Sequence, residues 1–188
     1  MKFIPGPING LFVIEETRHR DERGFFSETF RQDLFEATIG PFGFVQDNHV
    51  LSAKKGTVRG LHCQSPPKAQ GKLVRVSRGA IWDVAVDVRH GSPTFGAHFG
   101  IELDATQGRQ FWIPSGFLHG YCTLHDETEV QYKVTSGYDR SCDHQVRFDD
   151  PDLGIDWPVD PLAAQLSPKD RAAPRLKTLP VLFTYEDP

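Results

Sequence analysis

The sequence predicts an all-β protein, a sandwich or barrel of antiparallel strands with few short helices. Three observations carry this prediction: the apolar runs are short, several alternate with polar residues at the period of a strand, and 17 glycines and 14 prolines are spread between them. A chain of 188 residues, 38% of them hydrophobic, can bury one substantial core. We therefore expect a single domain over residues 1–188.

Residues 1–50 are expected to form the first strands and a short helix. Residues 11–15 have the composition of a strand, and a turn at 21–24 leads into another strand at 25–30. Alternation along this second strand places aromatic and acidic side chains on one face: Phe26, Glu28 and Phe30.

A helical segment is expected at residues 31–38, where it is ended by Gly40 and Pro41. The strand pattern resumes at residues 44–51 and places Gln46 and Asn48 on one side. Two amides on one face suit a polar ligand.

Residues 51–148 are expected to form the core of the barrel. Strands at 72–77 and 80–89 flank a turn at Arg78 and Gly79, which predicts a half-buried antiparallel hairpin. Four more strands are expected, at 95–103, 110–113, 118–123 and 129–136. Residues 149–188 are loop-rich, with a helical turn near Ser167, and are expected to pack on the barrel.

Composition excludes several classes of partner. The net charge of -4 argues against binding nucleic acid or an anionic membrane, because both require a cationic excess. Cys63, Cys122 and Cys142 are odd in number and lack a C-x-x-C spacing, which favours free thiols over disulfides or zinc. No apolar run has the length of a signal peptide or membrane span, so a cytoplasmic protein is expected.

His62 is the first candidate catalytic residue. It shares a strand face with Gly60 and Gln64, so its side chain would enter a polar or hollow space. A single histidine on a strand is nevertheless more often structural than catalytic. Arg59 would point to the opposite face in a regular strand, whereas a bulge at Gly60 would turn one of the two side chains.

Three other residues each have a structural and a chemical interpretation. Lys72 opens a strand with inward-facing valines and is either an ordinary strand-end lysine or a partner for an enolate oxygen. Tyr132 is either a core tyrosine or a proton donor. Asp170 is either the acid in the first turn of a helix capped by Ser167, or a carboxylate that accepts the ring N–H of His62.

Together these four residues could remove and return a proton beside a carbonyl. That chemistry needs a base, a group that stabilises the enolate oxygen, and a second proton donor on the opposite face. A metal-dependent enzyme and a non-catalytic binding module remain alternatives, although the sequence contains no His-x-His pair. Arg23, Arg59 and His119 would suit a diphosphate, because guanidinium groups match phosphate oxygens.

Nine short runs, in order along nearly the whole chain, resemble the dTDP-4-dehydrorhamnose 3,5-epimerase family of nucleotide-sugar enzymes. The runs are residues 21–28 (DERGFFSE), 46–48 (QDN), 58–62 (VRGLH), 71–75 (GKLVR), 83–87 (DVAVD), 91–96 (GSPTFG), 113–120 (IPSGFLHG), 131–135 (QYKVT) and 166–170 (LSPKD).

The resemblance implies a cupin jelly-roll barrel, a homodimer built through the N-terminal strands, and catalysis without a metal or cofactor. It implies that His62 is the general base oriented by Asp170, that Lys72 stabilises the enolate, and that Tyr132 supplies a proton from the other side. The substrate would be dTDP-4-keto-6-deoxy-D-glucose and the product dTDP-4-keto-L-rhamnose, inverted at carbons 3 and 5. A relative that inverts only one carbon would keep the same residues, so that alternative stays open.

The resemblance also implies a set of substrate-binding residues. Tyr138 would stack on the thymine base, and three residues of the set, Arg23, Phe26 and Glu28, would reach in from the partner chain. The full set is Arg23, Phe26, Glu28, Gln46, Asp47, Asn48, Arg59, His119, Tyr138, Asp143 and Lys169. The sequence departs from the family at Cys63, Tyr121 and Asp143, where an aromatic residue, a phenylalanine and a glutamate are more usual, and these departures bear on the shape of the pocket.

Overall fold

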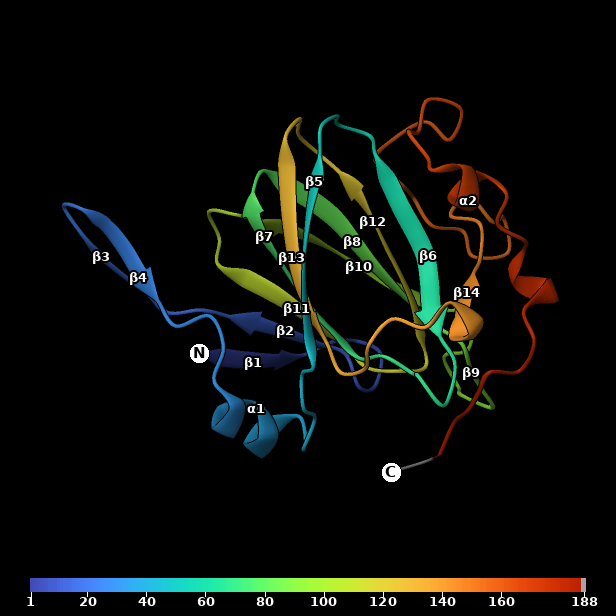
Figure 1. The fold of residues 1–188 in the computed structure, drawn as a ribbon, viewed down its shortest axis with the longest axis horizontal. Coiled ribbons are helices and arrows are strands. Elements are labelled where there is room, and N and C mark those ends of the chain that lie inside the picture. Colours follow the sequence, from blue (N-terminus) through green and yellow to red (C-terminus); the bar gives the residue numbers. More distant parts are fainter. Residues whose placement is uncertain (187–188) are drawn as a thin grey trace.

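Two antiparallel sheets packed face to face form the body of the protein, seen in a computed structural model that describes residues 1–186 (Figure 1). The first sheet has the order β1 (Lys2–Pro5), β2 (Phe12–Glu15), β11 (Arg109–Ile113), β7 (Lys72–Arg78), β13 (Thr128–Val134) and β5 (Gln46–Ser52). The second has the order β10 (His98–Asp104), β8 (Ala80–Asp87), β12 (Phe117–Thr123), β6 (Val58–Gln64) and β14 (Asp143–Gln145). The predicted all-β fold is confirmed.

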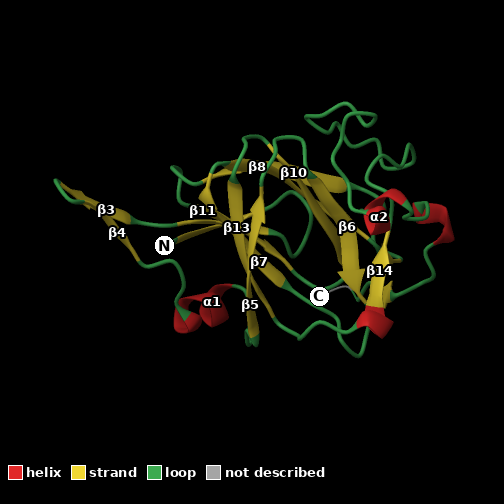
Figure 2. Ribbon diagram, turned by 45° about the horizontal axis from the view of Figure 1, so that its top comes forward, coloured by secondary structure: helices red, strands yellow, loops and turns green. Residues whose placement is uncertain are grey.

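A two-stranded arm extends beyond the sheets near the N-terminus. It consists of β3 (Arg18–Asp21) and β4 (Gly24–Ser27), which pair only with each other (Figures 1 and 2). The remaining elements are short: α1 (Gln32–Thr38), β9 (Arg89–His90), β15 (Phe183–Thr184), α2 (Pro168–Arg171), and the 3-10 turns Arg140–Cys142 and Leu176–Thr178. No helix within residues 1–186 is long and apolar enough to cross a membrane.

The main core lies between the two sheets. The first sheet contributes Val74, Phe111 and Val130, and the second contributes Ile81 and Leu103, all five fully buried. These residues sit on the inward face of each strand because side chains alternate across a strand. Burial of this apolar surface holds the two sheets together. A cavity between the sheets can form only where polar residues take the place of this core.

The predicted hairpin between residues 72–77 and 80–89 is wrong. β7 pairs with β11 and β13 in the first sheet, whereas β8 pairs with β10 and β12 in the second. The turn at Gly79, which has a φ of 76°, therefore carries the chain from one sheet across to the other. A glycine turn between two alternating strands looks the same in sequence whether the strands pair side by side or face one another across a core.

The C-terminal tail explains why β8 is also buried on both faces, not half-buried as predicted. Val84 and Val86 point to the outer side of the second sheet, where they pack against tail residues that include Leu153, Trp157 and Leu176. The tail thus lies over the outer face of the second sheet (Figure 1), and the apolar side chains of β8 pack on one side against the central core and on the other against the tail.

The segment after the arm packs on the outer face of the first sheet. The strand expected over residues 25–30 ends at Ser27, and Phe30 instead contacts the buried Phe35 of α1, with ring centroids 5.7 Å apart. Phe35 in turn meets Trp112 of β11 edge to face at 5.0 Å. These aromatic contacts fix the base of the arm against the sheet.

Replacing Phe111 with alanine tests the central core. Phe111→Ala should lower the free energy of unfolding by about 3–5 kcal/mol, because a large side chain buried between both sheets leaves a cavity. Urea denaturation measures this change. The matched control is Leu162→Ala in the tail, where the side chain is 96% exposed and the loss should stay within about 0.5 kcal/mol. Equal losses in both variants would contradict this placement of the core.

Candidate active site

A cavity of 270 Å³ opens between the two sheets where the apolar core gives way to polar side chains. Both sheets and the tail contribute to its lining, which is Val50, Arg59, His62, Lys72, His119, Tyr121, Tyr132, Ser167 and Asp170. The structure therefore brings together all four residues for which the sequence suggests proton-transfer chemistry, although they are spread over residues 62–170.

A bulge in β6 brings Arg59 and His62 into this cavity. His62 lies opposite His119 of β12, but Arg59 lies opposite Tyr121, so β6 has one extra residue between the two pairs. Gly60 takes up the irregularity with a φ of 128°, which confirms the bulge predicted from the sequence. Because of this extra residue, side chains three positions apart both line the cavity.

His62 is held by the carboxylate of Asp170. The Nε2 atom of His62 and the Oδ1 atom of Asp170 are 2.5 Å apart, and α2 carries Asp170 beside β6 (Figure 2). This bond assigns the N–H to Nε2 and leaves Nδ1 of the imidazole able to accept a proton. Both interpretations of Asp170 hold at once, since its backbone N–H donates to Ser167 Oγ at 3.0 Å as in a helix cap.

The charge on Asp170 is favoured although the residue is only 5% exposed. Burial alone would raise the pKa of its carboxyl group, but hydrogen bonds from His62 and Ser167 outweigh burial and lower it. The Ser167 hydroxyl donates to Oδ2 at 2.6 Å. An ionised Asp170 stabilises the positive charge that His62 gains when it takes a proton.

Lys72 and Tyr132 enter the cavity from β7 and β13 of the first sheet, facing His62 from the opposite sheet. Burial lowers the pKa of the Lys72 ammonium, and Cys63, Asp83 and Asp143 oppose this only in part. Burial raises the pKa of Tyr132 against the influence of Arg59, so its phenol is protonated at neutral pH. The cavity thus holds a phenol donor on the side away from His62.

His119 is paired with a buried acid that was not among the sequence candidates. Its Nε2 atom lies 2.6 Å from Asp83 Oδ1, and Asp83 is fully buried. Burial lowers the pKa of His119 more than Asp83 raises it, and nearby Lys72 and His62 lower it further. Asp83 could have been found from the alternation of β8, which places it on the inner face with Ala85.

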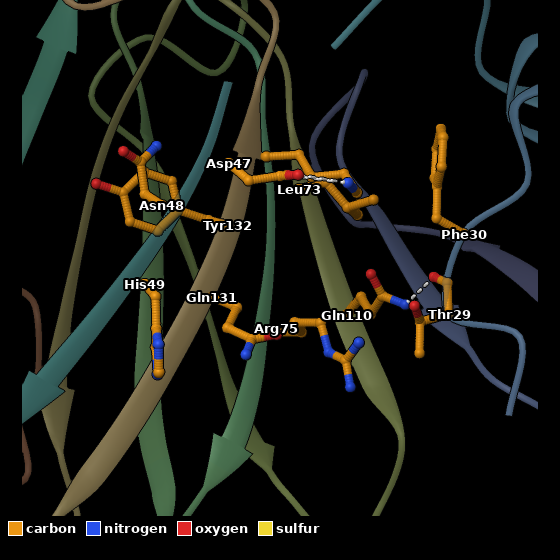
Figure 3. A pocket seen from close by; sticks show the side chains of 11 residues that line it. Thr29, Phe30, Asp47, Asn48, His49, Leu73, Arg75, Gln110, Gln131 and Tyr132 are labelled. Carbon is orange, nitrogen blue, oxygen red and sulfur yellow. Dashed lines mark hydrogen bonds and ion pairs between the residues drawn. The ribbon is translucent and has the colours of Figure 1, made fainter. Parts of the chain in front are cut away.

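The expected binding residues of the N-terminal half divide into two groups. Gln46 and Asn48 lie on one face of β5 as predicted, joined by a hydrogen bond of 2.8 Å, and Asn48 pairs in register with Tyr132. Asp47 points to the outer face, where Lys133 binds it at 2.9 Å. Figure 3 shows the cavity of 380 Å³ at this face, which Asp47, Asn48 and Tyr132 help to line and where Gln110 is bonded to Thr29.

Three expected binding residues lie on the arm, away from the cavity of their own chain. Arg23 is at the exposed tip, where it pairs with Asp21 at 2.6 Å. Phe26 and Glu28 line a separate hollow of 370 Å³ near the N-terminus. None of the three belongs to the lining that contains His62.

Near Lys72, three other expected binding residues form a cluster. Asp143 accepts hydrogen bonds from the Tyr138 hydroxyl, at 3.1 Å, and from Lys169. Asp143 and Lys169 are close enough to Lys72 to act on its pKa, and the Tyr138 side chain is largely exposed. The cluster therefore offers charge and an exposed aromatic ring beside the catalytic candidates. Within residues 1–186 no group of three or more histidine, cysteine or acidic side chains could hold a metal ion.

A model of the dTDP-4-dehydrorhamnose 3,5-epimerase family matches residues 5–178. The chain belongs to this family. Curated relatives of that name include one from Sinorhizobium fredii, 50% identical over 92% of this chain and 88% of the relative, and one from Salmonella typhimurium, 47% identical over 94% and 96%. A relative from Streptomyces niveus, 39% identical over 92% of this chain and 83% of its own, is named a 3-epimerase.

Solved structures of the family have the same fold. A 3,5-epimerase from Legionella pneumophila, in complex with dTDP-4-keto-L-rhamnose, superposes with a TM-score of 0.94 at 43% identity over 99% of each chain. The expected jelly-roll fold of the cupin type is thereby confirmed, and the chain is an isomerase that acts on carbohydrates.

Substitution of Gly60 tests the bulge. A Cβ atom there would lie 2.5 Å from Gly120 Cα and 2.7 Å from His119 O, so Gly60→Ala must push β6 from β12 and displace His62. We expect kcat/KM to fall at least about tenfold. Gly96→Ala is the matched control, because Gly96 also has a positive φ, of 79°, but nothing within 4 Å of the added carbon. If both variants retain full turnover, the bulge does not position His62.

Proposed function

We propose that His62, Lys72, Tyr132 and Asp170 perform the epimerisation of dTDP-4-keto-6-deoxy-D-glucose at carbons 3 and 5, which yields dTDP-4-keto-L-rhamnose. The observation that carries this assignment is their convergence on one cavity from two facing sheets and the tail. Relatives of 44–51% identity named 3,5-epimerases favour inversion at both carbons over inversion at one.

The keto group at carbon 4 makes the protons on both neighbouring carbons acidic. Nδ1 of His62 removes such a proton while Asp170, bonded to Nε2, stabilises the resulting imidazolium. The Lys72 ammonium faces the negative charge that develops on the enolate oxygen. Lys72 lines the same cavity as His62 and Asp170. It can therefore stabilise the enolate oxygen whether the proton leaves carbon 3 or carbon 5.

Inversion requires that the proton return to the face opposite the one it left. His62 comes from β6 in one sheet and Tyr132 from β13 in the other, so a sugar ring between the sheets meets the base on one side and the phenol on the other. Tyr132 then gives its proton to the enolate carbon. The nearby Arg59 stabilises the phenolate left behind.

Binding energy for the reaction comes from the nucleotide part of the substrate. Arg59 binds the diphosphate oxygens, and so does His119 when its ring is protonated, because Nδ1 then donates while Nε2 stays bonded to Asp83. Gln46 and Asn48 supply amide contacts, and the exposed ring of Tyr138 stacks on the thymine. Asp143 accepts hydrogen bonds from Tyr138 and Lys169 and so holds the Tyr138 ring in place. Asp143 and Lys169 also lie close enough to Lys72 to act on its pKa. Contacts remote from the reacting carbons hold the small keto-sugar in place.

We infer that two copies of the chain complete each other's cavities. Phe25 and Phe26 are 52% and 71% exposed on an arm that projects from the body, and Arg23 and Glu28 lie on the same segment, away from the cavity of their own chain. An arm of this kind extends to a second copy in a symmetric homodimer.

The three free buried cysteines fit a cytoplasmic enzyme.

Isotope exchange separates the base from the acid. In heavy water His62→Asn should take up no deuterium at carbon 3 or 5, because no group removes the proton. Tyr132→Phe should still exchange deuterium but form little inverted product, since the return from the opposite face is lost. NMR of recovered sugar nucleotide measures both quantities.

The controls are His98→Asn, on an exposed strand position, and Tyr185→Phe, whose ring contacts Arg89. Both should behave like the wild-type protein. Deuterium uptake by His62→Asn at the wild-type rate would reject His62 as the base, and label at a single carbon in the wild type would reject the double epimerisation.

Mixing two inactive variants tests the arm. Arg23→Ala damages the arm and His62→Asn damages the cavity, so a mixed dimer contains one cavity in which both are intact. After subunit exchange of equal amounts, about a quarter of wild-type activity should return, because half of the dimers are mixed and each has one working site. An arm that serves its own chain would give no recovery.

A further inference from the structure

Tyr121 lies at the boundary between the apolar core and the catalytic cavity. Its ring belongs to the central core, with Ile81, Ala85 and Val130 among the members of the same cluster. The residue is 3% exposed, yet it also lines the cavity that contains His62 and Tyr132. One end of the side chain is therefore packed in the core and the other reaches the space that a substrate would fill.

The hydroxyl of Tyr121 has no partner. It is a buried polar atom that makes no hydrogen bond to any residue of the described chain, 1–186. The Ser52 hydroxyl lies close enough to lower the pKa of Tyr121 and accepts a hydrogen bond from Arg59 Nε at 3.2 Å, but no hydrogen bond of normal geometry joins Ser52 to Tyr121. A buried hydroxyl without a partner is unfavourable, and few such groups occur in native proteins without a reason.

The polar side chains of the cavity fall into two sets. One set is already engaged: His62 with Asp170, His119 with Asp83, and Arg59 with Ser52. The other set, Lys72, Tyr121 and Tyr132, makes no side-chain hydrogen bond to residues 1–186 and lines the same cavity. Lys72 and Tyr132 already have parts in the proposed reaction, which leaves Tyr121 as the unused member.

We propose that Tyr121 is a substrate-binding residue, whose hydroxyl donates a hydrogen bond to an oxygen of the sugar bound between His62 and Tyr132. This inference rests on the proposed function for the location of the sugar. Burial raises the pKa of the Tyr121 phenol and thereby keeps it protonated, as a donor requires.

The sugar is the partner, not the nucleotide, because of where Tyr121 lies. It lines the same 270 Å³ cavity as His62, Lys72 and Tyr132, the residues assigned to the reacting sugar. The exposed Tyr138 ring, proposed for the thymine, is outside this lining. A donor in the lining of this cavity selects for a sugar with an oxygen within its reach, since an analogue without one leaves the hydroxyl unpaired.

Tyr121→Phe removes only the oxygen and keeps the ring in the core. Calorimetric titration with dTDP and with dTDP-glucose, which lacks the keto group and does not react, separates sugar contacts from nucleotide contacts. We expect unchanged affinity for dTDP and about 3- to 10-fold weaker binding of dTDP-glucose, the effect of one neutral hydrogen bond. The thermal midpoint of the unliganded variant should equal or exceed that of the wild type, because an unpaired buried hydroxyl is lost.

Tyr185→Phe is the matched control and should leave both affinities unchanged, since Tyr185 packs on Arg89 outside the cavity. Unaltered binding of both ligands by Tyr121→Phe, an equal loss for both, or a lowered thermal midpoint would each overturn the inference. The comparison measures binding alone and does not depend on turnover. If the wild-type protein bound dTDP-glucose but did not epimerise the keto-sugar, the proposed function would be rejected. The two affinities of Tyr121→Phe would still show whether Tyr121 binds the sugar.

Discussion

The hydrogen bond between His62 and Asp170 is the interaction on which the site depends. It joins a strand of the second sheet to a helix of the C-terminal tail, over 108 residues of sequence. The bond requires the bulge at Gly60, which directs His62 into the cavity, and the Ser167 cap, which holds Asp170 in its turn. A carboxylate kept ionised beside the imidazole accepts a hydrogen bond from the proton on Nε2 and so leaves Nδ1 as the ring nitrogen with a free lone pair.

The two-sheet architecture provides what a single sheet could not, which is access to both faces of a substrate ring. The apolar core packs between the two sheets, and the cavity forms where polar residues replace it. His62 lies on one sheet and Tyr132 on the other, so in the proposed reaction they approach the ring from opposite sides. The fold thus places the proposed base and the proposed acid on facing sheets, and this is the geometry that an inversion needs.

Most strands could be predicted from the sequence because alternation is a local property. The bulge was also predictable, since Gly60 stands between two polar residues that would otherwise point apart. The crossing at Gly79 was not, because the pairing of β7 and β8 depends on strands far away in the chain. The cap at Ser167 could be predicted locally, but the contact of Asp170 with His62 could not, because it joins residues 108 positions apart.

The candidate site shows the same division between local and distant information. The four candidate proton-transfer residues were predicted from their residue types and from the family resemblance. The pairing of His119 with Asp83 and the unpaired hydroxyl of Tyr121 emerge only from the packed structure. Both depend on how strands of the second sheet align in register. Such alignment is set by the whole core rather than by any one segment.

The central claim is that base and acid lie on opposite faces of the sugar ring. A crystal structure of the protein with dTDP-glucose bound tests it most directly. The account predicts that Nδ1 of His62 and the Tyr132 hydroxyl lie on opposite sides of the sugar ring, each facing the region of carbons 3 and 5. A ring with both groups on the same side, or one bound away from His62, would contradict it.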